Sequence, residues 1–335
     1  MNTVRKIWEK CNIMEKYPHI ASFLRFDEPL SLHTTFRTGG PADLFFSPSS
    51  REDLFLCLDV CLEHDIPLYL LGGGSNLLVS DAGVRGAVIS TTGLSGISPV
   101  AVYDGDQNSA GVSVVSGTPM EDLVEWCVDH AVGGMERFAG LPGSVGGAVF
   151  MNARCYDKQI SDVFYRAECL SFDGKGYTLV HTAFSADQWA YKVSPFQVRP
   201  QTDPLSLGAG SAIILSVEFS LSVADPVFLR QECDRYVEDR RNKGHFRFPS
   251  AGSMFKNNRD FGKPSGMIID EAGLRGFRIG DAQVAPWHGN IVINTGSARS
   301  GDIRRLVDEV QRIVREKTGF TLEPEVIMAG EWSLS

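Results

Sequence analysis

Leu71-Gly72-Gly73-Gly74-Ser75-Asn76-Leu77-Leu78 is the stretch that decides the fold, because three glycines and two small polar residues directly follow a predicted strand, Leu68–Leu71. Without Cβ atoms, the backbone can approach a ligand closely and present successive N–H groups to an anion such as a diphosphate. The loop lacks the G-x-G-x-x-G spacing of a Rossmann fingerprint and the lysine of a P-loop. Alone, it indicates either a phosphate cradle or a tight turn.

A second glycine cluster runs from Gly140 to Gly147 and is followed by Met151-Asn-Ala153. Four glycines and a proline within so short a segment cost chain entropy that a plain connector would not require. We therefore favour a second close approach of backbone to ligand over a merely crowded turn. Each of the two loops strengthens the interpretation of the other.

Helices and short strands alternate on both sides of these loops. A capping-box-like pair at Ser50 and Asp53 opens a helix that ends before Pro67, and Thr118 is expected to cap a helix that Pro119 opens. Further strands are predicted at 86–90, 112–116, 167–170 and 212–221, a loop at 196–207, and helices at 120–131, from 226 onward and at 302–317. The pattern is typical of an α+β or α/β protein with short strands.

The chain has 335 residues, of which 43% are apolar and 22% are charged, with 34 glycines and 16 prolines. This composition excludes a disordered, collagenous or disulfide-stapled protein. At roughly 100–150 residues per domain, two or three domains are expected. We predict a helical N-terminal extension at 1–29, a domain at 30–223 with lobes of about 30–100 and 101–223, and a C-terminal domain at 224–335.

Charge and cysteine usage limit the partners. Forty-one acidic against 32 basic residues give a net charge of −9, which disfavours nonspecific binding to nucleic acid or anionic membrane. No stretch approaches the about 18 uninterrupted apolar residues of a membrane span, and the start lacks a signal-peptide core. Seven unpatterned cysteines favour buried thiols in a reducing cytoplasm, and no His or carboxylate spacing indicates a metal site.

Five motifs in order carry a family resemblance. They are His33-Thr-Thr-Phe-Arg-Thr-Gly-Gly-Pro-Ala42, Gly72–Asn76, Ala139–Gly147, Pro249-Ser-Ala-Gly-Ser-Met-Phe-Lys-Asn257 and Leu322-Glu-Pro-Glu-Val326. Together they resemble the UDP-N-acetylenolpyruvoylglucosamine reductases of peptidoglycan synthesis, in the subgroup that lacks a Tyr-Gly-Asp-Leu loop. The resemblance implies an α+β fold, with a two-part FAD-binding domain of the vanillyl-alcohol-oxidase (PCMH) type and a smaller α+β C-terminal substrate domain. It also implies that NADPH reduces the flavin, which in turn reduces an enolpyruvyl ether to a lactyl ether.

The resemblance places FAD on the two glycine loops. The expected cofactor-binding residues are Gly72, Gly73, Gly74, Ser75, Asn76, Gly140, Pro142, Gly143, Ser144, Gly146, Gly147 and Asn152. The family's usual Asn-Ala-Gly-Ala-Tyr-Gly here reads Asn152-Ala-Arg154-Cys-Tyr-Asp157, so two glycines are replaced by charged residues beside the expected flavin. Arg154 could add a pyrophosphate contact, or the loop could take another path.

Hydride addition to the enolpyruvyl methylene carbon leaves negative charge on the neighbouring carbon, so the site must stabilise that charge and then supply a proton. Ser253 matches the family's proton-donating serine, and Glu325 matches its catalytic glutamate. Without the resemblance, Ser253 would be a turn or cap hydroxyl. Alternation in an extended Leu322–Ile327 segment puts Glu323 on the same face as Glu325, so position alone does not separate the two carboxylates.

The third catalytic position departs from the family pattern. Where the family reads Tyr-Arg-x-Ser-x-Phe, this chain reads Tyr191-Lys192-Val-Ser-Pro-Phe196. Lys192 keeps the positive charge that would bind the substrate carboxylate, but it loses the two-pronged fork of arginine. We favour lysine acting as a point charge, although another arginine could substitute or activity could be reduced.

The remaining expected substrate contacts are Tyr191, Lys243, Lys256, Asn257 and His288. Three of them lie in or close to the stretch from Arg235 to Arg259, where seven basic and two acidic residues give a local charge of +5 that suits anionic ligands. His288 could equally be a surface or satisfied histidine. Two other functions stay open, a flavin oxidoreductase of the same fold with a different substrate and a flavin- or nucleotide-sugar binder without turnover.

Overall fold

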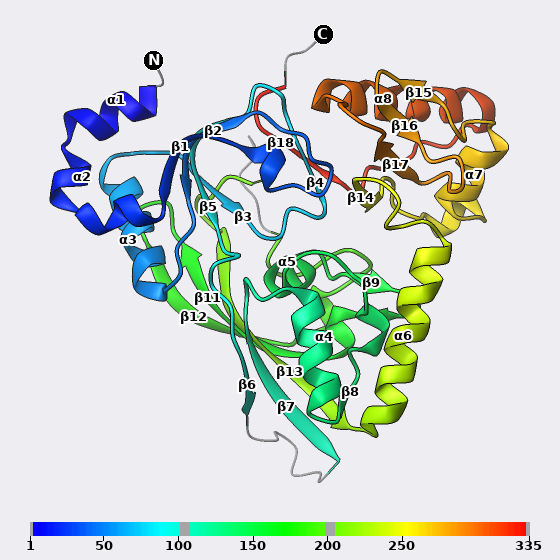
Figure 1. Cartoon of the computed structure of the whole chain (residues 1–335), viewed down its shortest axis with the longest axis horizontal. Coiled ribbons are helices and arrows are strands. Elements are labelled where there is room, and N and C mark those ends of the chain that lie inside the picture. The colour runs from blue at the N-terminus through cyan, green and yellow to red at the C-terminus, as the bar shows by residue number, and fades with distance from the viewer. Residues whose placement is uncertain (1–2, 101–107, 198–204, 333–335) are drawn as a thin grey trace. The chain divides into compact units, whose positions relative to one another are not determined.

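The computed structural model describes residues 3–100, 108–197 and 205–332 (Figure 1). Helices α1 (Thr3–Lys10) and α2 (Ile13–Lys16) and the 3-10 helix η1 (Pro18–Ser22) precede strand β1 (Leu24–Pro29). Trp8 is only 1% exposed, and its ring lies 5.8 Å from that of Phe46. The segment expected to be an extension therefore contributes to a hydrophobic core.

Two sheets form most of the larger part of the molecule. One has the order β1-β2-β5-β3, with β2 at Pro41–Phe46, β5 at Val84–Ser90 and β3 at Leu68–Leu71. The other, of six strands, has the order β12-β11-β13-β7-β6 with β8 beside β13; its strands are β6 (Ile97–Val100), β7 (Ser109–Val115), β8 (Val132–Gly133), β11 (Phe164–Phe172), β12 (Tyr177–Ala183) and β13 (Ala212–Val223). The predicted strands at 68–71, 86–90, 112–116, 167–170 and 212–221 all lie within or overlap these strands.

Three helices illustrate how the local signals act. Helix α3 (Arg51–Glu63) begins as expected, because the Ser50 hydroxyl accepts a hydrogen bond from the Asp53 amide. Helix α4 (Met120–Asp129) has Pro119 as its N-cap, so the expected Thr118 cap is wrong. The Thr118 hydroxyl instead accepts a hydrogen bond of 3.0 Å from the Gly96 amide. Helices α4 and α5 (Val145–Phe150) pack with the six-stranded sheet around one core (Figure 1).

The chain divides into two compact units, each built from three segments. Unit 1 comprises Met1–Phe26, Asp43–Gly73 and Gly86–Asp239, and unit 2 comprises Asp27–Ala42, Gly74–Arg85 and Arg240–Ser335. We predicted continuous domains with a boundary near residue 223. In the structure each unit combines three segments of the chain, and the last division falls between Asp239 and Arg240. Helix α6 (Pro226–Asn242) buries Leu229, Cys233 and Tyr236 in the core of unit 1, so the change of unit falls near its end.

Unit 2 packs helix α8 (Ser300–Thr318) on a four-stranded sheet of order β14-β17-β16-β15 (Figure 1). The strands are β14 (Ser250–Ser253), β15 (Arg278–Ile279), β16 (Ala282–Val284) and β17 (Ile291–Asn294), and helix α7 is at Ser265–Glu271. Strand β4 (Leu77–Val79) pairs in parallel with β18 (Ile327–Ala329). Phe36 and Leu78 from the early segments belong to the same core as α8.

Short elements complete the described part. They are β9 (Arg154–Cys155), β10 (Lys158–Gln159), η2 (Leu30–Leu32), η3 (Glu136–Phe138), η4 (Ile160–Asp162), η5 (Ala186–Gln188) and η6 (Arg259–Phe261). Within residues 3–100, 108–197 and 205–332, no helix is long and apolar enough to span a membrane, and no cluster of metal-ligating side chains is present. The seven cysteines are free thiols, six of them buried.

Candidate functional site

The two glycine loops, each expected to approach a ligand, contact each other in unit 1. The Gly73 amide donates a hydrogen bond to the Ser144 hydroxyl at 3.3 Å. A Cβ atom on Gly73 would lie 2.6 Å from the Cα of Gly143, and one on Gly72 would lie 2.8 Å from the Ser144 hydroxyl. Only glycine allows the loops to approach this closely. The contact leaves Gly72, Gly73 and Gly143 half-buried, with side-chain-free backbone still partly accessible.

The amides at the start of α5 are already used within the protein. The Gly146 amide donates to the Ser116 carbonyl at 2.7 Å, and the Gly147 amide donates to the Ser144 hydroxyl at 3.3 Å. An anion nest formed by these two amides is therefore not what the second loop offers. Its contribution is an open backbone surface, with Pro142 exposed and Gly140 half-buried at a φ of +71°. Within the described residues, the buried Ser116 hydroxyl has no hydrogen-bond partner.

The second half of the first loop belongs to unit 2. Gly74 has a φ of +61°, and a Cβ there would lie 1.9 Å from the carbonyl oxygen of His33. The Asn76 side-chain amide donates to the Glu325 carbonyl at 3.1 Å, and Ser75 between them is half-buried. Three of the motifs that are far apart in sequence therefore adjoin one another within unit 2.

Asn152, expected to contact the cofactor, directs its side chain into the protein. It is fully buried, its Nδ2 donates to the Ala190 carbonyl at 2.9 Å, and its Oδ1 accepts from the Ser161 amide at 3.0 Å. Its side-chain amide therefore links helix α5 to the turn that carries Lys192. Lys192 is half-buried with a φ of +60°, and its Nζ lies 5.9 Å from the centre of the exposed Tyr191 ring.

Ser253 and Glu325 come together in unit 2 through backbone pairing. Ser253 ends β14 opposite Ile291 of β17, and the next residue, Met254, accepts a hydrogen bond of 2.8 Å from the Glu325 amide. A bridge between Phe255 and Pro324 extends this pairing. This pairing is an isolated bridge, since β18 begins only at Ile327, and it sets the Glu325 backbone beside the serine's strand.

The surroundings of Glu323 and Glu325 differ, although their positions in the sequence do not distinguish the two carboxylates. The Glu323 side chain is 69% exposed and forms an ion pair of 2.5 Å with Lys256. Glu325 is half-buried. Lys256, an expected substrate contact, therefore has a protein carboxylate as the partner of its side chain. Its backbone carbonyl accepts a hydrogen bond of 2.6 Å from the Ser265 hydroxyl.

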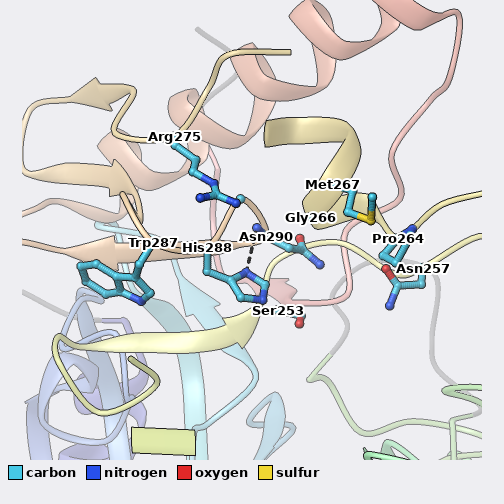
Figure 2. A pocket seen from close by; sticks show the side chains of 10 residues that line it. Ser253, Asn257, Pro264, Gly266, Met267, Arg275, Trp287, His288 and Asn290 are labelled. Atoms are coloured by element: carbon cyan, nitrogen blue, oxygen red, sulfur yellow. Dashed lines mark hydrogen bonds between the residues drawn. The ribbon is translucent and has the colours of Figure 1, made fainter. Parts of the chain in front are cut away.

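A pocket of about 270 Å³ opens beside Ser253 within unit 2 (Figure 2). Three of the expected site residues line it, namely Ser253, Asn257 and His288. Asn257 also orients the start of α7, because its Oδ1 accepts from the Ser265 amide at 2.9 Å. The sequence analysis missed two polar lining residues, Arg275 and Asn290. Neither residue belongs to one of the five family motifs, so the sequence carried no direct signal for them.

His288 is a half-buried hydrogen-bond donor facing this pocket. The Asn290 amide donates to its Nδ1 at 3.1 Å, so Nε2 carries the proton (Figure 2). Burial, followed by the positive charges of Arg275 and Lys243, lowers the pKa of His288 below its ordinary value of 6.5. Lys243 is itself exposed. The pocket lining therefore combines an N–H donor with the Arg275 guanidinium, which also pairs with Asp270 at 2.6 Å, and this combination suits an anionic ligand.

The lowered pKa of His288 makes folding stability depend on pH. The unfolded chain protonates this histidine at a higher pH than the folded chain does, so its stability contribution is complete above pH 6.5 and is lost as the pH falls. We expect the Tm of His288→Gln to fall less than that of the parent between about pH 7.5 and about pH 5. Thermal unfolding across this range measures the difference, and coincident curves would contradict the assignment.

Comparisons with known proteins are consistent with these features. The FAD binding domain family matches residues 42–179, and the UDP-N-acetylenolpyruvoylglucosamine reductase C-terminal domain family matches residues 244–329. A protein of the reductase name from Treponema denticola is 43% identical, covering 92% of this chain and 94% of its own length. One from Borreliella burgdorferi is 35% identical, covering 90% and 93%. The crystal structure of the Thermus caldophilus reductase, MurB, aligns with a TM-score of 0.68 and 29% identity over 92% of this chain and 100% of its own.

The fold and the paired glycine loops define an FAD-binding protein of the α+β class expected from the sequence, with a C-terminal substrate domain. The residues present fit the cofactor, since two loops leave half-buried backbone free of side chains beside an unpartnered Ser116 hydroxyl. With 43% identity over nearly its whole length to a curated member, the chain belongs to the UDP-N-acetylenolpyruvoylglucosamine reductase family.

Because Gly73 and Gly143 are in contact, we expect FAD retention to be sensitive to one added methyl group. Gly73→Ala would place a Cβ 2.6 Å from backbone, and overpacking of this kind costs about 1–3 kcal/mol. We expect a lower Tm and a lower ratio of flavin to protein absorbance after purification. Gly176→Ala is the matched control, because a Cβ there meets nothing within 4 Å. Full flavin content in Gly73→Ala would show that the loops tolerate separation.

Proposed function

We propose that this chain catalyses the NADPH-dependent, FAD-mediated reduction of UDP-N-acetylglucosamine enolpyruvate to UDP-N-acetylmuramate, a cytoplasmic step of peptidoglycan precursor synthesis. Family membership and the two domain matches support the reaction. The observation that carries the assignment of the site is the pairing of the Glu325 segment with the end of β14, beside a pocket with His288 and Arg275. Bound FAD supplies the hydride that NADPH delivers.

Three side chains act on the reacting group. Ser253 donates the proton that completes the lactyl ether, and Glu325, as a protonated carboxyl group, donates a hydrogen bond to the developing enolate. Lys192 binds the enolpyruvyl carboxylate as a point charge. The backbone of Glu325 is fixed by the Met254 carbonyl and the Asn76 side chain, so its carboxyl group is preorganised.

The pocket of unit 2 binds the nucleotide-sugar part of the substrate. His288 donates through Nε2, while Lys243 and the pocket residue Arg275 supply positive charge for a diphosphate. Tyr191, Lys256 and Asn257 are further substrate contacts in this proposal. Lys256 contacts the substrate while its side chain stays paired with the Glu323 carboxylate. FAD binding falls mainly to the larger unit and substrate binding to the smaller.

An anaerobic titration of the purified protein tests the proposal. A yellow flavin spectrum should be bleached by NADPH and restored by the enolpyruvyl sugar nucleotide. Restoration by oxygen but not by this substrate would instead indicate a flavin oxidoreductase with a different substrate. A protein that NADPH does not bleach would be a binder without turnover. Either result would overturn the proposed reaction.

A further inference from the structure

The turn that carries Lys192 holds an unusual backbone conformation. Ala190 and Val193 exchange both backbone hydrogen bonds, of 3.2 and 3.0 Å, so Tyr191 and Lys192 form the tip of a tight turn. Lys192 has a φ of +60°, whereas Tyr191 does not have a positive φ. This is the third turn position, which ordinarily takes glycine or asparagine. A lysine persists there only if its surroundings determine the conformation.

Side chains fix this turn to the end of helix α5. The Gln197 amide nitrogen donates to the Lys192 carbonyl at 3.0 Å and to the Phe150 carbonyl at 2.8 Å. The Ser194 hydroxyl donates to the same Phe150 carbonyl at 2.7 Å. On the other side of the turn, the buried Asn152 amide donates to Ala190. One end of the turn is therefore tied to the last residue of α5 and the other to Asn152, two residues beyond it, all within unit 1.

The Gln197 side chain can bridge the two carbonyls, whereas alanine or glutamate at this position could not. Both of its N–H donors are used, one on each carbonyl, so an alanine removes one hydrogen bond from the Lys192 carbonyl and one from the Phe150 carbonyl. A glutamate keeps the shape but offers no donor and would place a negative charge against two carbonyl oxygens. Because lysine lacks the rigid fork of arginine, the direction of its charge depends on how firmly its backbone is held.

We propose that Gln197 is a positioning residue for the reductase reaction, with Asn152 as its counterpart across the turn. It acts by fixing the strained Lys192 backbone so that the ammonium group meets the substrate carboxylate. This inference rests on the role proposed above for Lys192. It reassigns the side chain of Asn152 from cofactor binding to support of the same turn.

The test compares Gln197→Ala and Gln197→Glu with Lys192→Ala in the flavin-loaded enzyme. Misplacement of a substrate-binding charge costs up to about 100-fold, so we expect kcat/KM for the enolpyruvyl substrate to fall by about 10- to 100-fold in each Gln197 variant. NADPH should bleach the flavin at an unchanged rate. Gln188→Ala, a change of the same type at an exposed site nearby, is the control and should behave as the parent does.

A double variant separates positioning from a general structural role. If Gln197 acts through Lys192, adding Gln197→Ala to Lys192→Ala lowers kcat/KM no further. Additive losses would overturn the inference, as would unchanged activity in both Gln197 variants. A Lys192→Ala enzyme with full activity would show that Lys192 does not bind the substrate carboxylate, and this inference would fall with it. The proposed reaction would still be tested separately by the anaerobic NADPH titration. Should Gln197→Ala unfold, the glutamate variant, which preserves side-chain volume, carries the comparison.

Discussion

Ser253→Ala is expected to lower kcat for reduction of the enolpyruvyl substrate by about 10²- to 10⁴-fold, the range of a lost general acid. Ser253 ends β14 and lines the pocket of unit 2, where the family's proton donor is matched. Since the hydroxyl serves only the second half of the reaction, NADPH should still bleach the flavin at the parent rate. Rapid-mixing absorbance measurements of the two half-reactions give this contrast directly.

Ser250→Ala provides the matched control for this variant. Ser250 begins the same strand and pairs with Ile293 on the same neighbour, β17, but it does not line the pocket. We expect the control to keep nearly full activity. A Ser253→Ala enzyme that turns over as fast as the control would exclude the serine as the proton donor and return it to the role of a turn hydroxyl.

Glu325→Gln is expected to lower kcat, by up to about 10²- to 10³-fold, because an amide N–H is a much weaker acid than a carboxyl O–H and stabilises a developing oxyanion less. The substitution keeps the shape of the side chain, and the backbone bonds from Asn76 and to Met254 do not involve the carboxyl group. The loss should therefore appear in kcat rather than in Tm. Steady-state kinetics with thermal unfolding of the same preparation separates the two.

Glu323→Gln is the comparison that makes this prediction discriminating. Its carboxylate is 69% exposed and paired with Lys256, and an exposed pair of this kind contributes at most about 1 kcal/mol to stability. We expect nearly unchanged kcat and Tm. If Glu323→Gln were inactive and Glu325→Gln active, Glu323 rather than Glu325 would be the catalytic residue.

Features that depend on neighbouring residues, or on motifs in a fixed order, could be predicted from the sequence. Apolar spacing located α3, α4 and α8, and the Ser50 cap follows from a local hydrogen bond. A close approach at each glycine loop was also predictable, because clustered glycines are costly unless another group comes close to the backbone, but the contact between the two loops was not predicted. The family motifs correctly indicated the reductase family.

What could not be predicted depends on which distant partner a polar side chain finds. Thr118 has a residue type typical of a cap, yet the Gly96 backbone competes successfully for its hydroxyl. Asn152 lies in a flavin motif, yet its amide is used by Ala190 and Ser161. The ion pair that distinguishes Glu323 from Glu325 joins residues 67 positions apart. None of these pairings leaves a periodic or compositional signal.

The three-segment build of unit 2 has a consequence for how the chain can acquire its structure. Its core includes Phe36 and Leu78, and β18 finds its parallel partner in β4, some 250 positions earlier in the chain. Residues 244–329, although they match a family domain on their own, would expose that core and leave β18 unpaired if expressed alone. During synthesis, the early segments must wait for β18 to emerge, so the smaller unit cannot be completed before that strand has left the ribosome.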